Sequence, residues 1–81
     1  MMRKMSKGSR KSTEEIMTAA TSFFGAGGLG LTETDRAECC VTFEGGGGFV
    51  RVTTNASDGG SEVEVETSEW EQAASRFLVG V

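Results

Sequence analysis

The sequence contains no histidine, no tyrosine and no proline, and its 81 residues include a single tryptophan and two cysteines. Histidine is the commonest general base, the usual partner of nucleophilic serine and cysteine, and a frequent zinc ligand. Its absence removes the commonest routes to acid–base catalysis and to zinc binding. We therefore expect a protein that is not an enzyme, with no catalytic residues, no metal ligands and no cofactor.

The two cysteines are adjacent, at Cys39 and Cys40. Two ligands are too few for a structural zinc site, and neighbouring strand residues point to opposite faces. The sequence therefore predicts a buried Cys39 and a half-exposed Cys40, both as free thiols, and it leaves open whether Cys40 is reactive. Free thiols of this kind suit the reducing cytoplasm. No apolar run approaches the roughly 20 residues of a membrane span, so we expect a cytoplasmic protein.

Charge is distributed unevenly along this mildly acidic chain, whose net charge is −4. The segment Met1–Lys11 has no hydrophobic periodicity and is predicted to be a disordered basic tail, followed by a single α+β domain over residues 12–81. A signal peptide that continues into Ile16–Leu31 is the alternative for this end of the chain. All the acidic residues follow the tail, so only the tail offers a contact for nucleic acid or membranes. Its basic residues are Arg3, Lys4, Lys7, Arg10 and Lys11.

The middle of the chain has the pattern of three β-strands joined by two turns. The clearest strand contains Val63 and Val65 on one face and glutamates on the other. Such alternation is typical of a sheet with one buried face and one face in water. The predicted strands and turns, in chain order, are Cys39–Glu44, Gly45–Gly48, Phe49–Thr54, Asn55–Gly60 and Glu62–Thr67.

The water-facing side of this predicted sheet is acidic. Grouped carboxylates can bind calcium or magnesium, but a solvated strand face accounts for them without any ligand. We therefore predict no metal site, and whether the acidic face is used stays open. The glutamates concerned are Glu44, Glu62, Glu64 and Glu66.

Two amphipathic helices flank the predicted strands. Each begins with a capping-box pattern, Ser12-Thr13-Glu14-Glu15 and Ser68-Glu69-Trp70-Glu71, and Gly25 ends the first helix. Apolar residues follow at helical spacing, which predicts that one side of each helix packs on the sheet. The first stripe contains Ile16, Ala20, Phe23 and Phe24, with Met17 at its border, and the second contains Trp70, Ala73, Ala74, Phe77, Leu78 and Val81.

These elements predict an α+β fold in which an antiparallel meander of three or four strands carries both helices on the same face. The order is α-β-β-β-α, or α-β-β-β-β-α if Leu31–Thr34 is also a strand. The glycine-rich Gly25–Gly30 matches the letters of a dinucleotide-binding loop, but it follows a helix, whereas such a loop follows a strand. The run Phe43–Gly48, the alternating strands after it and Glu69-Trp70 at the start of a terminal helix are together similar to small uncharacterised prokaryotic domains. No functional residue follows from so general a likeness.

The leading functional hypothesis is a small non-enzymatic binding or assembly module that forms a homodimer through a sheet edge. One alternative is a carrier of small apolar ligands, with a pocket between the helices and the sheet. Another is weak contact with nucleic acid or a membrane through the basic tail. The residues predicted to line the pocket of the carrier are Phe23, Phe24, Phe43, Trp70 and Phe77.

Overall fold

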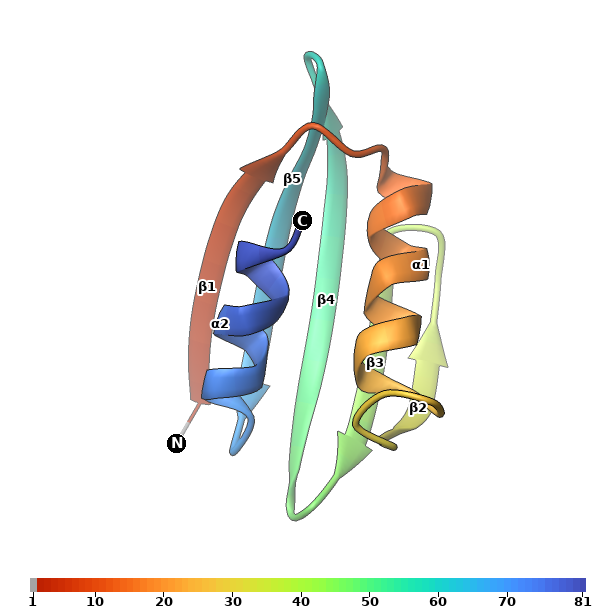
Figure 1. Ribbon diagram of the computed structural model, residues 1–81, viewed down its shortest axis with the longest axis vertical. Helices are drawn as coiled ribbons and strands as arrows, with labels where there is room; N and C mark the ends of the chain where they lie inside the picture. The colour runs from red at the N-terminus through yellow and green to blue at the C-terminus, as the bar shows by residue number, and fades with distance from the viewer. Residues whose placement is uncertain (1) are drawn as a thin grey trace.

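The computed structural model describes residues 2–81 and contains a five-stranded antiparallel sheet with two helices on one face (Figure 1). The strands lie side by side in the order β1-β5-β4-β3-β2. The predicted α+β class is confirmed, and the sheet has one strand more than the upper prediction. The elements are β1 (Met2–Ser9), α1 (Thr13–Phe24), β2 (Thr32–Arg36), β3 (Cys40–Gly45), β4 (Gly48–Ser57), β5 (Gly60–Ser68) and α2 (Glu71–Val79).

The unexpected strand is β1, which is built from the segment predicted to be a disordered tail. It pairs antiparallel with β5 along its whole length, from Met2 opposite Ser68 to Ser9 opposite Ser61. Without β1, the Glu-rich strand β5 would be a sheet edge with a row of unpaired backbone groups. Backbone pairing needs no strong apolar pattern, and for that reason the composition of the segment did not reveal the strand.

The optional fourth strand is also present. It was predicted at Leu31–Thr34, and β2 spans Thr32–Arg36 and pairs with β3. Leu31 lies just before β2 and is buried, whereas every residue of β2 is exposed. The pairing register shifts between Glu33 and Asp35. The strand is therefore short, irregular and located at the edge of the sheet opposite β1.

Both predicted turns are shorter than the sequence suggested. Of the four glycines predicted to form the first turn, only Gly46 and Gly47 lie between β3 and β4, with φ of +59° and +80°. Two successive positive φ values are what a two-residue type I′ hairpin requires, and glycine adopts them without steric cost. The second turn is closed at Asp58-Gly59, because β4 continues to Ser57.

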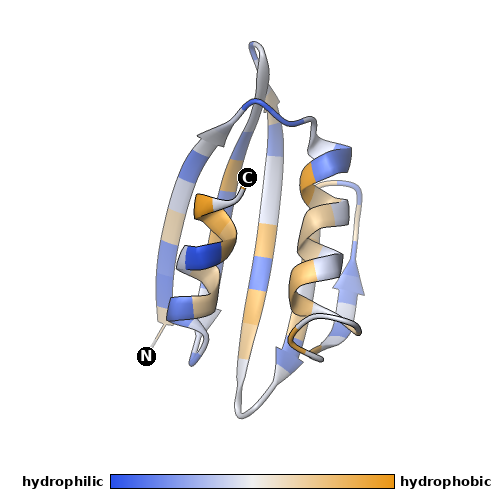
Figure 2. Cartoon of the chain, in the orientation of Figure 1, coloured by the Kyte–Doolittle hydropathy of each residue, from blue (hydrophilic) through white to orange (hydrophobic). Residues whose placement is uncertain are grey.

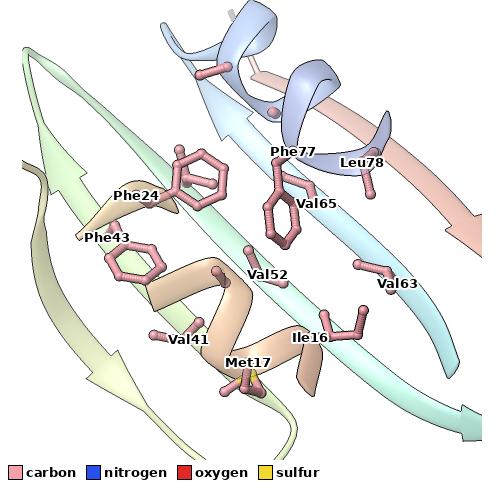
Figure 3. Packing of buried hydrophobic residues seen from close by; sticks show 14 of the residues in the cluster. Ile16, Met17, Phe24, Val41, Phe43, Val52, Val63, Val65, Phe77 and Leu78 are labelled. Atoms are coloured by element: carbon pink, nitrogen blue, oxygen red, sulfur yellow. The ribbon is translucent and has the colours of Figure 1, made fainter. Parts of the chain in front are cut away.

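The core lies between the helices and the sheet (Figure 3). Figure 2 shows the same division: hydrophobic residues concentrate on the helices and central strands, and the edge strands β1 and β2 are mostly hydrophilic. Both predicted helical stripes are confirmed, with Phe23, Trp70 and Val81 only partly buried. The buried cluster contains Ile16, Met17, Ala20, Phe24, Leu31, Val41, Phe43, Val50, Val52, Val63, Val65, Ala73, Ala74, Phe77 and Leu78.

The two predicted capping boxes have different outcomes. At α1, the Ser12 amide donates to Glu15 Oε1 at 2.9 Å and the Glu15 amide donates to Ser12 Oγ at 3.2 Å, so this box is confirmed. The hydrogen bond from the Ser12 amide lowers the pKa of the Glu15 carboxyl. The prediction of a box at Ser68 is wrong, because Ser68 stays in the sheet opposite Phe49. Helix α2 begins after Trp70, which makes no side-chain capping bond.

Between β5 and α2 the chain passes through a backbone conformation that favours glycine. Glu69 has a φ of +75°, the only positive value at a non-glycine residue among residues 2–81. This conformation costs a residue with a Cβ atom roughly 1–2 kcal/mol. We expect Glu69→Gly to raise the free energy of unfolding by about 1 kcal/mol, after allowance for the greater freedom of glycine in the unfolded chain. Guanidinium denaturation followed by circular dichroism measures this change.

The matched control is Gln72→Gly, which places the same residue at an exposed position inside α2. There glycine has no steric advantage and should lower the free energy of unfolding by about 1 kcal/mol. If both substitutions lower stability by the same amount, the backbone at Glu69 is not strained.

Candidate functional site

The aromatic residues predicted to line a pocket pack mainly against one another. Phe24 lies at the centre, with ring centroids 4.9 Å from Phe23, 5.2 Å from Phe77 and 5.7 Å from Phe43. Phe23 also approaches Phe77 at 5.8 Å. Figure 3 shows the rings of Phe24, Phe43 and Phe77 directed into the space between helices and sheet. The structure thus brings four of the five residues together, as contacting core side chains.

Trp70, the fifth of these residues, lies at a different corner of the molecule. Its indole Nε1 donates to the backbone oxygen of Gly45 at 2.9 Å. A Cβ atom added at Gly46 would lie only 2.8 Å from Trp70 Cζ2, so the ring rests directly on the glycine turn. Trp70 therefore ties the start of α2 to the β3–β4 hairpin, at the corner where β5 gives way to helix.

We expect Trp70→Ala to lower the free energy of unfolding by about 3 kcal/mol, the lower end for truncation of a large aromatic residue, since this ring is only partly buried. Trp70→Phe keeps much of the packing and loses the hydrogen bond to Gly45, which should cost about 1 kcal/mol. Urea denaturation followed by circular dichroism gives both values. Equal stability of the wild type and the alanine variant would contradict this placement of the ring.

A shallow surface hollow lies between α1 and the turn that joins β2 to β3. One of its lining residues is Arg36, whose guanidinium donates to both carboxylate oxygens of Glu33, at 2.7 and 3.0 Å, and to Thr21 Oγ1 at 2.7 Å. The hydrogen bonds from Arg36 lower the pKa of the Glu33 carboxyl. Arg36 thus already has an anionic partner. The hollow is lined by Thr13, Glu14, Met17, Thr18, Thr21, Arg36, Ala37 and Glu38.

The acidic face of the sheet contains cations as well as carboxylates. Glu66 lies on β5 between Lys4 of β1 and Arg51 of β4, each directly opposite it in the pairing register. Glu64 lies between Ser6 and Thr53. Among residues 2–81, no group of three or more His, Cys, Asp or Glu side chains has an arrangement that could hold a metal ion.

The two cysteines differ from the prediction in pairing and in burial. Cys39 and Cys40 form a disulfide, whereas free thiols were predicted. Cys39 is exposed and Cys40 is only 9 % exposed, the reverse of the expected order. Strand β3 begins at Cys40, so Cys39 belongs to the preceding turn, and the rule that neighbouring strand residues point apart does not apply. Because both cysteines are oxidised, they do not indicate a reducing compartment.

The basic residues that the sequence assigned to a tail lie along β1 and in the loop after it. Lys4 is on the open face of the sheet, and Lys7 is on the face covered by the helices, opposite Val63. The Lys7 ammonium donates to the backbone oxygen of Leu78 at 2.8 Å and to that of Val81 at 3.4 Å. Carbonyl groups at the end of a helix lack intrahelical partners and carry partial negative charge. Lys7 therefore caps α2 and fastens it to β1.

Replacement of Lys7 by methionine keeps most of the aliphatic stem and removes the charge. We expect Lys7→Met to lower the free energy of unfolding by about 1 kcal/mol, because the end of α2 loses its cationic donor. Lys4→Met is the matched control on the same strand, and its effect should stay within about 0.5 kcal/mol. Thermal unfolding at low ionic strength compares the two variants. Equal losses in both would show that Lys7 contributes only as a surface charge.

Of the two sheet edges, β1 is the longer and more regular. Its eight residues pair with β5 without a register shift, whereas β2 has five residues and contains a shift. The side of β1 that faces away from β5 has no neighbouring strand in the sheet (Figure 1). This outer side of Met2–Ser9, here termed the β1 edge, carries backbone N–H and C=O groups of the kind that an added strand pairs with. The β1 edge is the candidate site. The sequence does contain a signal for β1, because its basic residues complement the three alternating glutamates of β5, the strand with which it pairs.

Comparison of the chain with protein-family models, with curated proteins and with solved structures finds no match in any of the three. Within residues 2–81, neither helix has the length and apolar character required to cross a membrane.

Proposed function

We propose that this chain is a non-enzymatic assembly module that forms a homodimer through the β1 edge. The observation that carries the proposal is the eight-residue, unshifted pairing of β1 with β5, which leaves a straight strand at the edge of the sheet. Antiparallel pairing of two such edges around a two-fold axis joins two sheets into one and keeps both helical layers on the same side. A chain of 81 residues buries a limited core, and a second copy adds burial.

Charge selects the register of this pairing. With Met5 on the two-fold axis, Arg3 of one copy lies opposite Lys7 of the other, and directly opposed like charges destabilise a strand pair. With Ser6 on the axis, no two cations are opposed. In that register Arg3 lies opposite Ser9, Lys4 opposite Gly8, and Met5 opposite Lys7. We therefore propose the register centred on Ser6.

The proposed interface still brings two basic strands together, and this determines its response to salt. At low ionic strength the cations of the two copies repel each other over distances of 10 Å or more, and at about 0.5 M salt the repulsion is largely screened. Dimerisation should therefore strengthen as salt is added. Contact of the same cations with nucleic acid or an anionic membrane would weaken with salt, so the two uses of this edge have opposite salt dependences.

The test is the solution mass of the full chain, measured by light scattering on a sizing column at low, moderate and high salt over a range of protein concentrations. We expect twice the chain mass of 8.5 kDa, with the dimer favoured by concentration and by salt. Ser6→Lys places two cations on the axis and should yield a monomer. Thr34→Lys makes the same kind of change at an exposed position of the other edge strand and should leave the dimer intact.

A wild-type chain that stays monomeric under all these conditions would refute the proposal. A dimer that survives Ser6→Lys but is lost in Thr34→Lys would move the interface to β2. The carrier hypothesis has less support, because four of its five residues contact one another in the core.

A further inference from the structure

The disulfide between Cys39 and Cys40 lies at the tight turn that joins β2 to β3. In this turn the Ala37 amide donates to the backbone oxygen of Cys40 at 2.8 Å, and the Cys40 amide donates to that of Ala37 at 3.3 Å. Cys39 is an exposed residue, and Cys40 is nearly buried. One end of the disulfide is therefore accessible to an attacking thiolate from solvent.

This disulfide does not hold the fold together. Neither cysteine belongs to the buried cluster between the helices and the sheet. A disulfide restricts the unfolded chain more when the loop that it closes is longer, and adjacent residues close the shortest loop there is. The bond can therefore open and re-form while the rest of the domain stays folded, which is the property that an exchangeable disulfide needs.

We propose that Cys39–Cys40 is a modification site for reversible thiol–disulfide exchange with dithiols. A thiolate of the dithiol attacks the sulfur of Cys39, the bond to Cys40 breaks, and Cys40 leaves as a thiolate that takes up a proton. The second thiol of the reagent then attacks the mixed disulfide, and Cys39 is released as the second thiol. Two electrons pass to the protein, and the reagent becomes a disulfide.

The surrounding contacts restrict the effect of this exchange to one edge of the sheet. The backbone oxygen of Cys39 accepts hydrogen bonds from the amide and the hydroxyl of Thr54, at 2.7 and 3.1 Å. Thr54 is buried within β4, so these bonds hold the start of β3 in place when the disulfide opens. On the other side, the turn leads into β2, in which every residue is exposed. Reduction should therefore loosen β2 and the turn, and leave β4 and β5 unchanged.

The first experiment counts thiols in folded protein purified without reductant. Ellman's reagent should detect no thiol before treatment with dithiothreitol and two afterwards, and glutathione disulfide should reverse the change. Two free thiols in the untreated protein that glutathione disulfide does not convert to a disulfide would overturn the proposal.

The second experiment measures amide hydrogen exchange in the oxidised and reduced forms. We expect severalfold faster exchange on reduction at Ala37, Cys40 and the amides of β2, with unchanged rates in β5. The double variant Cys39→Ser/Cys40→Ser should match the reduced form and stay insensitive to dithiothreitol. Identical exchange rates at the β2 amides in both forms would contradict the prediction that reduction loosens β2. Neither experiment depends on pairing at the β1 edge, so the outcome of both is independent of the proposed dimer.

Discussion

The structure depends on the need of β5 for a hydrogen-bonding partner on each side. Its residues on the helix-covered face, Ser61, Val63, Val65 and Thr67, have no exposed surface. A strand buried in this way cannot leave a row of backbone groups without partners, because burial removes the water that would otherwise satisfy them. β4 supplies one partner through the Asp58-Gly59 hairpin, and β1, from the opposite end of the sequence, supplies the other.

The sheet order β1-β5-β4-β3-β2 then determines where the helices lie. The chain leaves β1, crosses the sheet as α1 over β3 and β4, and returns through four consecutive antiparallel strands to β5 (Figure 1). Helix α2 packs over β5 and β1, and its C-terminal carbonyl groups come within reach of Lys7. The buried hydroxyl groups at the two ends of β5 both have hydrogen-bond partners. Ser61 Oγ donates to the backbone oxygen of Lys11, and Thr67 Oγ1 donates to that of Phe49. The first and last elements of the chain therefore stabilise each other.

The elements that the sequence could predict are those whose own residues carry a periodic signal. Val63 and Val65 alternate with glutamates, and the stripe around Phe77 repeats at helical spacing, so both were recognised. On the covered face of β1 the only apolar side chain is Met5, set between Arg3 and Lys7. That pattern resembles a charged tail. The strand forms because its backbone hydrogen-bonds to β5, and its own side chains give no periodic signal.

The other differences between the sequence-based predictions and the structure have a similar origin. In each, contacts made by the backbone override the structure that the local sequence pattern predicts. Ser68 has the sequence of a helix cap, but its backbone pairs with Phe49 and Met2, so the capping box cannot form. Alternation assigned Cys39 to a strand, but β3 begins at Cys40, and Cys39 lies in the turn that Ala37 and Cys40 close with two backbone hydrogen bonds. The candidate site was missed for this reason too, because a sheet edge is defined by which strand lacks a neighbour.

The proposed site also follows from what the rest of the sheet already uses. The covered face is filled by the core, and on the open face Glu66 lies between Lys4 and Arg51. Among residues 2–81, the outer sides of the edge strands β1 and β2 have no neighbouring strand, and β1 is the longer and more regular of the two. Natural proteins place lysine on edge strands to prevent indiscriminate pairing. In the proposed dimer, the cations of β1 would penalise the register centred on Met5 and permit the one centred on Ser6, so its specificity would come from the alternatives that are penalised.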